Sequence, residues 1–399
     1  MKITDVKTYL TAPHGSPFLF VEVLTDEGVT GVGEATLPQA NYLLVQGFEA
    51  VRPLVVGLDP ANIEEVWQRL FRRFLRIGPR GVVTCILSAI DIALWDIKGK
   101  VLGAPVYQLL GGPVRDSVPL YTHVQDATSG ISLDDVKEQA RRARADGYHA
   151  LKTDPFAWAR SRSGPFQGAS LLEWLTPGMI ADSVEWIEAI REAVGSDYEL
   201  MVDAHARFDV ATAIRAARAL ESQDLFWFEE PVPPESYAAL KQFREATTIP
   251  VSVGETLFSR YDFSPVFEDR LADYVMPDVA WTGGISELRR IAAMAETYYI
   301  PFSPHDAIGP VALMAAFHVC MATPNLYRQE CIHTRFDDFS TYVTPMFEHH
   351  DGALWPSDLP GLGIELVHDV IAEHALDPDD PRASPYMGDQ PSHSPLGPE

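Results

Sequence analysis

The sequence predicts an α/β protein in which an α+β domain is followed by a βα barrel. The first 115 residues place strands before helices, and from about residue 118 short apolar strands alternate with helices. The chain's 399 residues are enough for two domains or for one barrel-sized domain with an addition. An open, doubly wound sheet is the structural alternative, but no GxGxxG phosphate-binding fingerprint follows the first strand.

The first domain, residues 1–115, is expected to open with a small sheet. ITDVKTYL (3–10) alternates apolar and polar residues, and FLFVEVLTDEGVTGVGEA (18–35) contains two apolar strands around a turn. Two helices follow: residues 61–76 are amphipathic, and residues 82–99 form a more buried helix.

The second domain, residues 116–345, is expected to form the barrel. Its candidate strands are 118–124, 148–154, 198–206, 225–230, 249–255, 271–278, 300–305 and 326–331. Its candidate helices include 132–146, 178–194, 209–222, 235–246, 284–297 and 310–322. Such regular alternation is typical of parallel strands that close into a barrel with helices outside.

Two segments follow the predicted barrel. Residues 346–375 include GALWPSDLPGLGIEL, which we expect to pack back on the first domain. Residues 376–399 are rich in Pro, Asp, Ser and Gly and poor in apolar side chains, which predicts a mobile tail.

The composition is that of a soluble globular protein, with 46% hydrophobic and 22% charged residues. The formal charge, 31 − 56 = −25, argues against nucleic-acid binding, which needs a basic face. No apolar run is long enough for a membrane span, and the N-terminus has no signal-peptide core. Cys85, Cys320 and Cys331 show no CxxC spacing, so we expect reduced thiols and a cytoplasmic protein.

Three carboxylates follow consecutive candidate strands at equal intervals. Asp203, Glu229 and Glu255 are separated by 229 − 203 = 26 and 255 − 229 = 26 residues. Barrel active sites collect at the carboxyl ends of the strands, where these oxygens would surround one hard cation, and Mg²⁺ fits. The alternative is that each residue caps the next helix, but the equal spacing favours a metal site. Glu230 should point the other way along its strand.

Further polar residues stand at other strand ends. His205, two residues after Asp203, would share its face of the strand, either as a catalytic acid or as an ordinary polar end. Asp278 and His305 end neighbouring strands, where the carboxylate could fix the imidazole tautomer and leave the other nitrogen free to take a proton. Glu330 lies on the eighth strand.

Lys152 and Asp154 share one face of the second strand, where a substrate contact and a solvated end are both open readings. The long segment that follows, residues 154–178, is either a lid with an arginine such as Arg160 reaching a substrate carboxylate, or a subunit contact. His14, in the loop between the first two strands, is a candidate for contacting distal substrate hydroxyls.

Taken together, these motifs resemble a known family. AIDIALWDIKGKVLGAPVYQLLGG (89–112), VDAHARF, FEEP, GET and SPH follow one another as in the mandelate racemase subgroup of the enolase superfamily, over nearly the whole chain. The resemblance implies a (β/α)7β TIM-like barrel with an N-terminal α+β capping domain, and Mg²⁺ on Asp203, Glu229 and Glu255. It also implies a homo-oligomer, since relatives are commonly dimers or octamers.

Within the subgroup, two details favour dehydration. Racemases carry a KxK motif after the second strand, whereas this chain reads Lys152-Thr-Asp154 and lacks the second lysine. The Asp203-Ala-His205 arrangement resembles that of galactonate dehydratase and related sugar-acid dehydratases, in which this histidine protonates the departing 3-hydroxyl. The long loop is also similar to that of mannonate dehydratases.

The resemblance therefore implies a dehydratase of an aldonate or aldarate that yields a 2-keto-3-deoxy sugar acid. His305, oriented by Asp278, would remove the C2 proton, and His205 would protonate the leaving hydroxyl. Lys152 would contact the substrate carboxylate, and Glu330 would hydrogen-bond either that carboxylate or the intermediate, with Mg²⁺ stabilising the enediolate. Two alternatives stay open: a racemase, epimerase or cycloisomerase on the same scaffold, and a catalytically weak homologue with a regulatory role.

Overall fold

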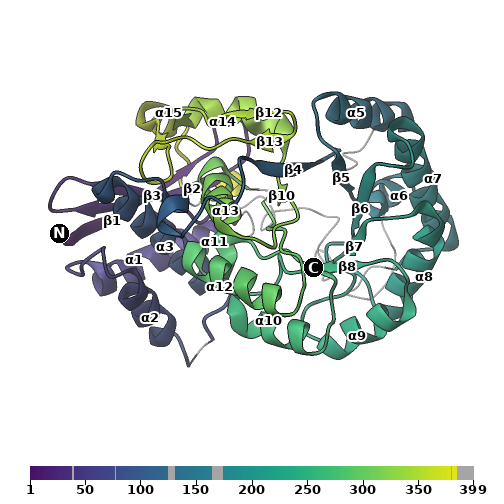
Figure 1. Ribbon diagram of the computed structural model, residues 1–399, viewed down its shortest axis with the longest axis horizontal. Coiled ribbons are helices and arrows are strands. Elements are labelled where there is room, and N and C mark those ends of the chain that lie inside the picture. Colours follow the sequence, from purple (N-terminus) through teal and green to yellow (C-terminus); the bar gives the residue numbers. More distant parts are fainter. Residues whose placement is uncertain are drawn as a thin grey trace.

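The computed structural model describes residues 1–37, 40–76, 78–124, 131–163, 174–306, 308–378 and 380–383. Figure 1 shows a smaller part, with the first sheet and helices, beside a ring of strands enclosed by helices. Among the described residues, no helix combines the length and apolar character that crossing a bilayer requires.

The smaller part begins with an antiparallel sheet of β1 (Ile3–Thr11), β2 (Phe18–Thr25) and β3 (Thr30–Glu34). The helices α1 (Asn41–Val55), α2 (Ile63–Arg73) and α3 (Val82–Leu102) follow. Strand β3 packs directly on α3, and a Cβ at Gly31 or Gly33 would lie about 2 Å from carbonyl oxygens of that helix. Only glycine allows the two backbones to approach so closely.

The barrel strands pair in parallel in the order of the sequence. They are β4 (Val118–His123), β5 (Ala150–Thr153), β6 (Glu199–Asp203), β7 (Trp227–Glu229), β8 (Val251–Val253) and β9 (Tyr274–Val275). Phe302 then bridges Val275 to Leu326, and β10 (Gln329–Glu330) pairs with β4 and closes the ring. The observed strands are shorter than the apolar runs that predicted them.

Seven of the described helices occupy the connections between successive strands, which confirms the predicted (β/α)7β barrel. They are α5 (Leu133–Ala145), α7 (Pro177–Val194), α8 (Val210–Leu220), α9 (Tyr237–Ala246), α10 (Ser259–Glu268), α12 (Gly284–Thr297) and α13 (Pro310–Ala322). Two shorter helices, α6 (Pro155–Ser163) and α11 (Val279–Thr282), lie in the same connections, and α4 (Val106–Leu109) precedes the first barrel strand.

The C-terminal segment returns to the first sheet, and Figure 1 shows α14 and α15 beside β1–β3. Its elements are α14 (Phe336–Tyr342), β11 (Val343–Thr344), β12 (His349–His350), β13 (Ala353–Leu354), β14 (Glu365–Leu366) and α15 (His368–Glu373). The backbone N–H of Leu376 donates to Leu10, and Ala383 is fully buried. The described start of the predicted tail therefore packs on the first domain, and residues 384–399 lie outside the described residues.

Two contacts join the first domain to the barrel beside the ends of the strands. Glu34, at the end of β3, accepts hydrogen bonds from the backbone N–H groups of Val311 and Ala312 at the start of α13. The indole N–H of Trp281 donates to the carbonyl of Thr36. These contacts tie Glu34 and Thr36 to α13 and to Trp281, whose ring also packs against His305.

Candidate active site

The three equally spaced carboxylates lie together at the carboxyl ends of β6, β7 and β8. Asp203 and Glu229 are register partners, and Glu255 follows β8 by two residues. One oxygen of each lies within 4.8 Å of the others. Burial and the neighbouring Asp203 raise the pKa of Glu229 well above its usual value, because like charges crowd a space that water does not reach. This set of three carboxylate ligands supplies only oxygen donors, which fits Mg²⁺.

Lys152, from β5, supplies positive charge to this cluster. Its ammonium contacts Glu229, and it lies 2.6 Å from Glu330 Oε1 and 3.4 Å from Asp203 Oδ2. Burial lowers the pKa of Lys152, but Glu229 and Glu330 outweigh it and raise the pKa well above its usual value. The side chain therefore stays charged among these three carboxylates.

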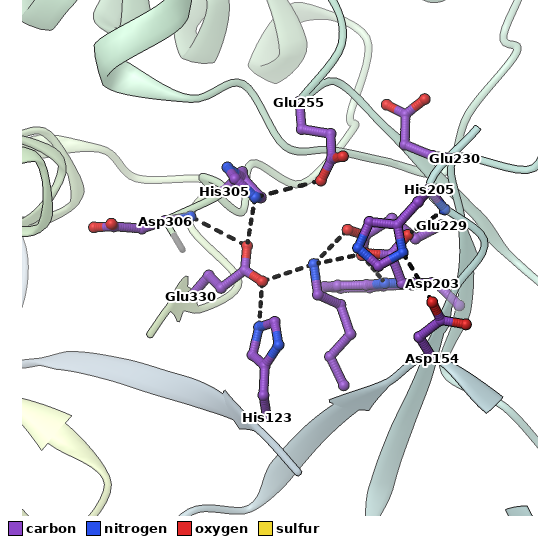
Figure 2. Close-up of polar contacts among 12 residues, drawn as sticks. His123, Asp154, Asp203, His205, Glu229, Glu230, Glu255, His305, Asp306 and Glu330 are labelled. Atoms are coloured by element: carbon purple, nitrogen blue, oxygen red, sulfur yellow. Dashed lines mark hydrogen bonds and ion pairs between the residues drawn. The ribbon is translucent and has the colours of Figure 1, made fainter. Parts of the chain in front are cut away.

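His305 lies at one end of the acidic cluster, and Figure 2 shows its contacts with Glu255 and Glu330. Asp278 contacts its other ring nitrogen. Its Nδ1 is 2.7 Å from Asp278 Oδ2, and its Nε2 is 3.3 Å from Glu255 Oε2. The ring of Trp281 packs against the imidazole with centroids 5.1 Å apart. Burial lowers the pKa of His305, but Glu330, Glu255 and Asp278 raise it to about 10.

His205 lies at the other end of the cluster, in a turn that follows β6 and not on the strand itself. Strand β6 ends at Asp203, and both His205 and Ala206 adopt left-handed conformations with φ of 48° and 54°. The expectation that Asp203 and His205 share one strand face was therefore wrong, since pleat alternation ends with the strand. The turn is held by hydrogen bonds from His205 N to Asp203 and from Ala206 N to Glu230 O.

The imidazole of His205 lies between two carboxylates. Its Nδ1 is 3.3 Å from Asp154 Oδ2, and its Nε2 is 3.4 Å from Asp203 Oδ2. Burial lowers the pKa of His205, while Asp203 and Asp154 raise it to about 9. Among the site histidines it is the accessible one, with 44% of its side chain exposed against 7% for His305.

Glu330 connects the two sides of the site, and it brings in a residue that the sequence did not single out. Its Oε1 lies 2.5 Å from His123 Nε2, and its Oε2 accepts a hydrogen bond from the backbone N–H of Asp306. Burial raises the pKa of Glu330, but Lys152 and His305 lower it well below its usual value. His123 ends β4, the first barrel strand, so the strand-end rule that found the other residues would also have found it.

Glu230 turns away from the cluster, as Figure 2 shows. One of its oxygens accepts from the N–H of Gly254 at 2.7 Å, and the other accepts from the hydroxyl of Thr256 at 3.0 Å. Its carboxylate therefore accepts hydrogen bonds from the residues on both sides of Glu255. Burial and the nearby Glu255 raise the pKa of Glu230 to about 8.

The remaining candidates have other surroundings. His14 is exposed, and its Nε2 lies 3.3 Å from Thr341 Oγ1 in α14. Arg160 lies in α6, so the segment predicted as a long loop begins as a helix. Arg162, from the same helix, stacks on Trp158 and faces acidic side chains of α7. Residues 164–173 of the predicted lid lie outside the described residues.

Two family profiles match the chain. That of the mandelate racemase/muconate lactonizing enzyme N-terminal domain covers residues 2–111, and that of the enolase C-terminal domain-like proteins covers residues 135–370. Both matches fall on the parts of the structure that carry the first sheet and the barrel.

Curated relatives and solved structures are similar over almost the full length. A D-galactonate dehydratase family member from Streptomyces bingchenggensis is 36% identical over 94% of both chains. A D-mannonate dehydratase from Caulobacter vibrioides is 35% identical over 94% of this chain and 95% of its own. The 3,6-anhydro-D-galactonate cycloisomerase from Zobellia galactanivorans superposes with a TM-score of 0.82 at 29% identity, covering 94% of this chain and 100% of its own.

Proposed function

We propose that this chain, which belongs to the mandelate racemase/muconate lactonizing enzyme family of the enolase superfamily, is a hydro-lyase that removes water from a sugar acid. The substrate class is an aldonate or aldarate, and the product is a 2-keto-3-deoxy sugar acid. One observation carries the proposal: two histidines flank the acidic cluster, His305 against Glu255 and His205 against Asp203.

The cation would be held by Asp203, Glu229 and Glu255, whose oxygens converge on one point. When bound, Mg²⁺ acts as a Lewis acid that stabilises the negative charge developing on the substrate carboxylate as the C2 proton leaves. Lys152 adds a fixed positive charge to the same region, since burial among acidic groups keeps its ammonium protonated.

Proton removal is assigned to His305. Its Nδ1 is engaged by Asp278, which leaves Nε2 directed at the cluster, where C2 of a carboxylate-bound substrate would lie. The C–H electron pair remains with the substrate, and the proton passes to Nε2. The pKa of His305 falls when the charge of Glu255 is neutralised, as ligation to a cation would do, and a neutral imidazole can then act as the base.

Loss of the hydroxyl is assigned to His205. As the C3–O bond breaks, a proton from its imidazole joins the departing oxygen, so that water leaves and the enol product becomes the 2-keto acid. A two-base racemisation would need a second base on the side of β5, but position 154 carries an aspartate whose oxygens contact Arg207 and His205. The residues of this site therefore favour elimination over proton return.

The test is a panel of aldonates and aldarates incubated with the protein and Mg²⁺, with semicarbazide to trap the keto acid. We expect semicarbazone with at least one member of the panel and none when the metal is removed by chelation. If no member is turned over, the dehydratase assignment fails, and a non-catalytic homologue becomes the better description.

A second candidate is a cycloisomerase, because the superposed Zobellia galactanivorans enzyme carries that activity on a similar fold. A cycloisomerase returns a product with the mass of its substrate, whereas a dehydratase product is lighter by one water. Mass spectrometry of the product of any active panel member separates the two.

A further inference from the structure

Asp154 is a buried carboxylate at the end of β5, and only 3% of its surface is exposed. Its Oδ1 accepts hydrogen bonds from the backbone N–H groups of Phe156 and Ala157, each at 3.0 Å, and so caps the start of α6. Its Oδ2 lies 2.5 Å from the guanidinium of Arg207 and 3.3 Å from His205 Nδ1. These four contacts use the acceptor sites that a carboxylate offers, so little capacity is left for a substrate hydroxyl.

The side chain that needs this support is His205. It stands in a left-handed turn beyond the end of β6, with 44% of its side chain exposed. A partly exposed imidazole on such a turn has more than one rotamer open to it, because neighbouring atoms enclose only part of the ring. Asp154 gives the ring a fixed partner at Nδ1. With Nδ1 held there, Nε2 on the opposite side of the ring faces Asp203 (Figure 2).

The same construction occurs at the other end of the site. Asp278 engages Nδ1 of His305, and Nε2 of that ring faces Glu255. Both histidines thus present Nε2 to the acidic cluster and turn Nδ1 to a carboxylate from a neighbouring strand end. Each carboxylate also caps a helix, since Asp154 accepts from the first backbone N–H groups of α6 and Asp278 accepts from Ala280 N in α11. Asp154 is in addition paired with Arg207.

We propose that Asp154 is a positioning residue, which holds the His205 ring so that Nε2 meets the hydroxyl that leaves in the elimination. The inference rests on the proposed dehydration, in which His205 is the proton donor. It replaces the expectation that Asp154 contacts the substrate directly. It also links α6 to the proton donor through one carboxylate.

The decisive variant is Asp154→Asn. Its amide oxygen can still cap α6, but its NH₂ group cannot accept from His205 or Arg207. We expect keto-acid formation to fall by about 10- to 100-fold, the range typical of an outer-sphere partner, while exchange of the C2 proton with solvent deuterium continues. Asp154→Ser, which also retains a helix cap, should behave in the same way.

The matched control is Asp209→Asn. Asp209 caps α8 by accepting from the N–H of Thr212 at 2.7 Å, so the substitution is identical and the local role is similar. We expect this control to keep both exchange and dehydration. If Asp154→Asn dehydrates like the wild type, or if exchange and dehydration fall in equal proportion, the positioning role is refuted, since a merely loosened fold would lower both.

A readout without turnover separates this inference from the proposed function. Crystal structures of the Asp154→Asn and Asp209→Asn variants, both loaded with Mg²⁺, should show the His205 ring displaced or in several rotamers only in the first. If the ring keeps its place in both, the inference fails even where the wild type is a dehydratase. If no sugar acid is turned over, the proposed function fails, and the ring positions still test whether Asp154 orients His205.

Discussion

The clearest pH-dependent stability prediction concerns His318, a buried histidine of α13 outside the candidate active site. Its Nδ1 accepts a hydrogen bond from the backbone N–H of Tyr107 at 3.2 Å, and its ring stacks on that side chain. Burial lowers its pKa from 6.5 to about 4, so the folded protein keeps the ring neutral. A proton on Nδ1 would remove this acceptor and place a charge in the core.

The sign and size of the effect follow from that shift. Between pH 6.5 and pH 4 the unfolded chain binds a proton at this histidine and the folded chain does not, so stability falls as the pH falls. At 1.36 kcal/mol per pH unit, His318 lowers the free energy of unfolding by about 3 kcal/mol as the pH falls over this range, and it has no such effect above pH 7. His318→Asn, which places an amide oxygen near the position of Nδ1, should remove most of this loss.

The assay is urea unfolding at several pH values from 7 to 4, with Val319→Ala as the control. Val319 is the next buried residue in α13, so its truncation also loosens the core but keeps His318 and the rings that pack on it. We expect the control to lower the free energy of unfolding by a similar amount at every pH. If the free energy of unfolding of His318→Asn falls with pH as steeply as that of the wild type, the idea that the folded protein buries His318 as a neutral ring is refuted.

Three further predictions concern the site and the core. His205→Asn should retain Mg²⁺ binding and C2 deuterium exchange but release keto acid about 10²- to 10⁴-fold more slowly. His305→Asn should lose exchange as well. Full dehydration by His205→Asn would contradict the role of His205 as the proton donor. Glu230→Ala should weaken Mg²⁺ binding by about 10- to 100-fold in calorimetric titrations, because it frees both neighbours of Glu255, and unchanged affinity would argue against this support. Phe243→Ala should lower the free energy of unfolding by about 3–5 kcal/mol in urea, because Phe243 of α9 is fully buried against Phe228 of β7, and a loss under 1 kcal/mol would contradict the packing.

The fold class and the acidic cluster could be predicted because they depend on regular, local patterns. Each apolar run marked a strand, and parallel strands of a barrel end at one edge. A carboxylate at each of three consecutive strand ends therefore had to arrive near the others, as Asp203, Glu229 and Glu255 do. The same rule would have included His123, which ends the first barrel strand.

Other features depended on structure beyond the strand ends. Helix α1 was not predicted, although its buried face repeats at helical spacing through Leu44, Phe48, Val51 and Val55. The side chain of Glu230 could be excluded from the cluster by alternation, but its bonds to Gly254 and Thr256 come from a different strand. Hydrogen bonds between residues that follow two different strands depend on how neighbouring βα units pack. The local sequence pattern of one strand does not contain that information.

The end of β6 shows both cases, a feature that the sequence predicted and a feature that it did not. The apolar pattern of the sequence predicted a strand over residues 198–206, and the 26-residue spacing placed Asp203 at the level of two other carboxylates. The end of β6 at Asp203 and the direction of the His205 side chain were visible only in the folded chain. Its turn is left-handed and lies outside the pleat, and its ring is fixed by Asp154, which is 51 residues earlier in the chain (205 − 154 = 51) and reaches it only when β5 and β6 pair.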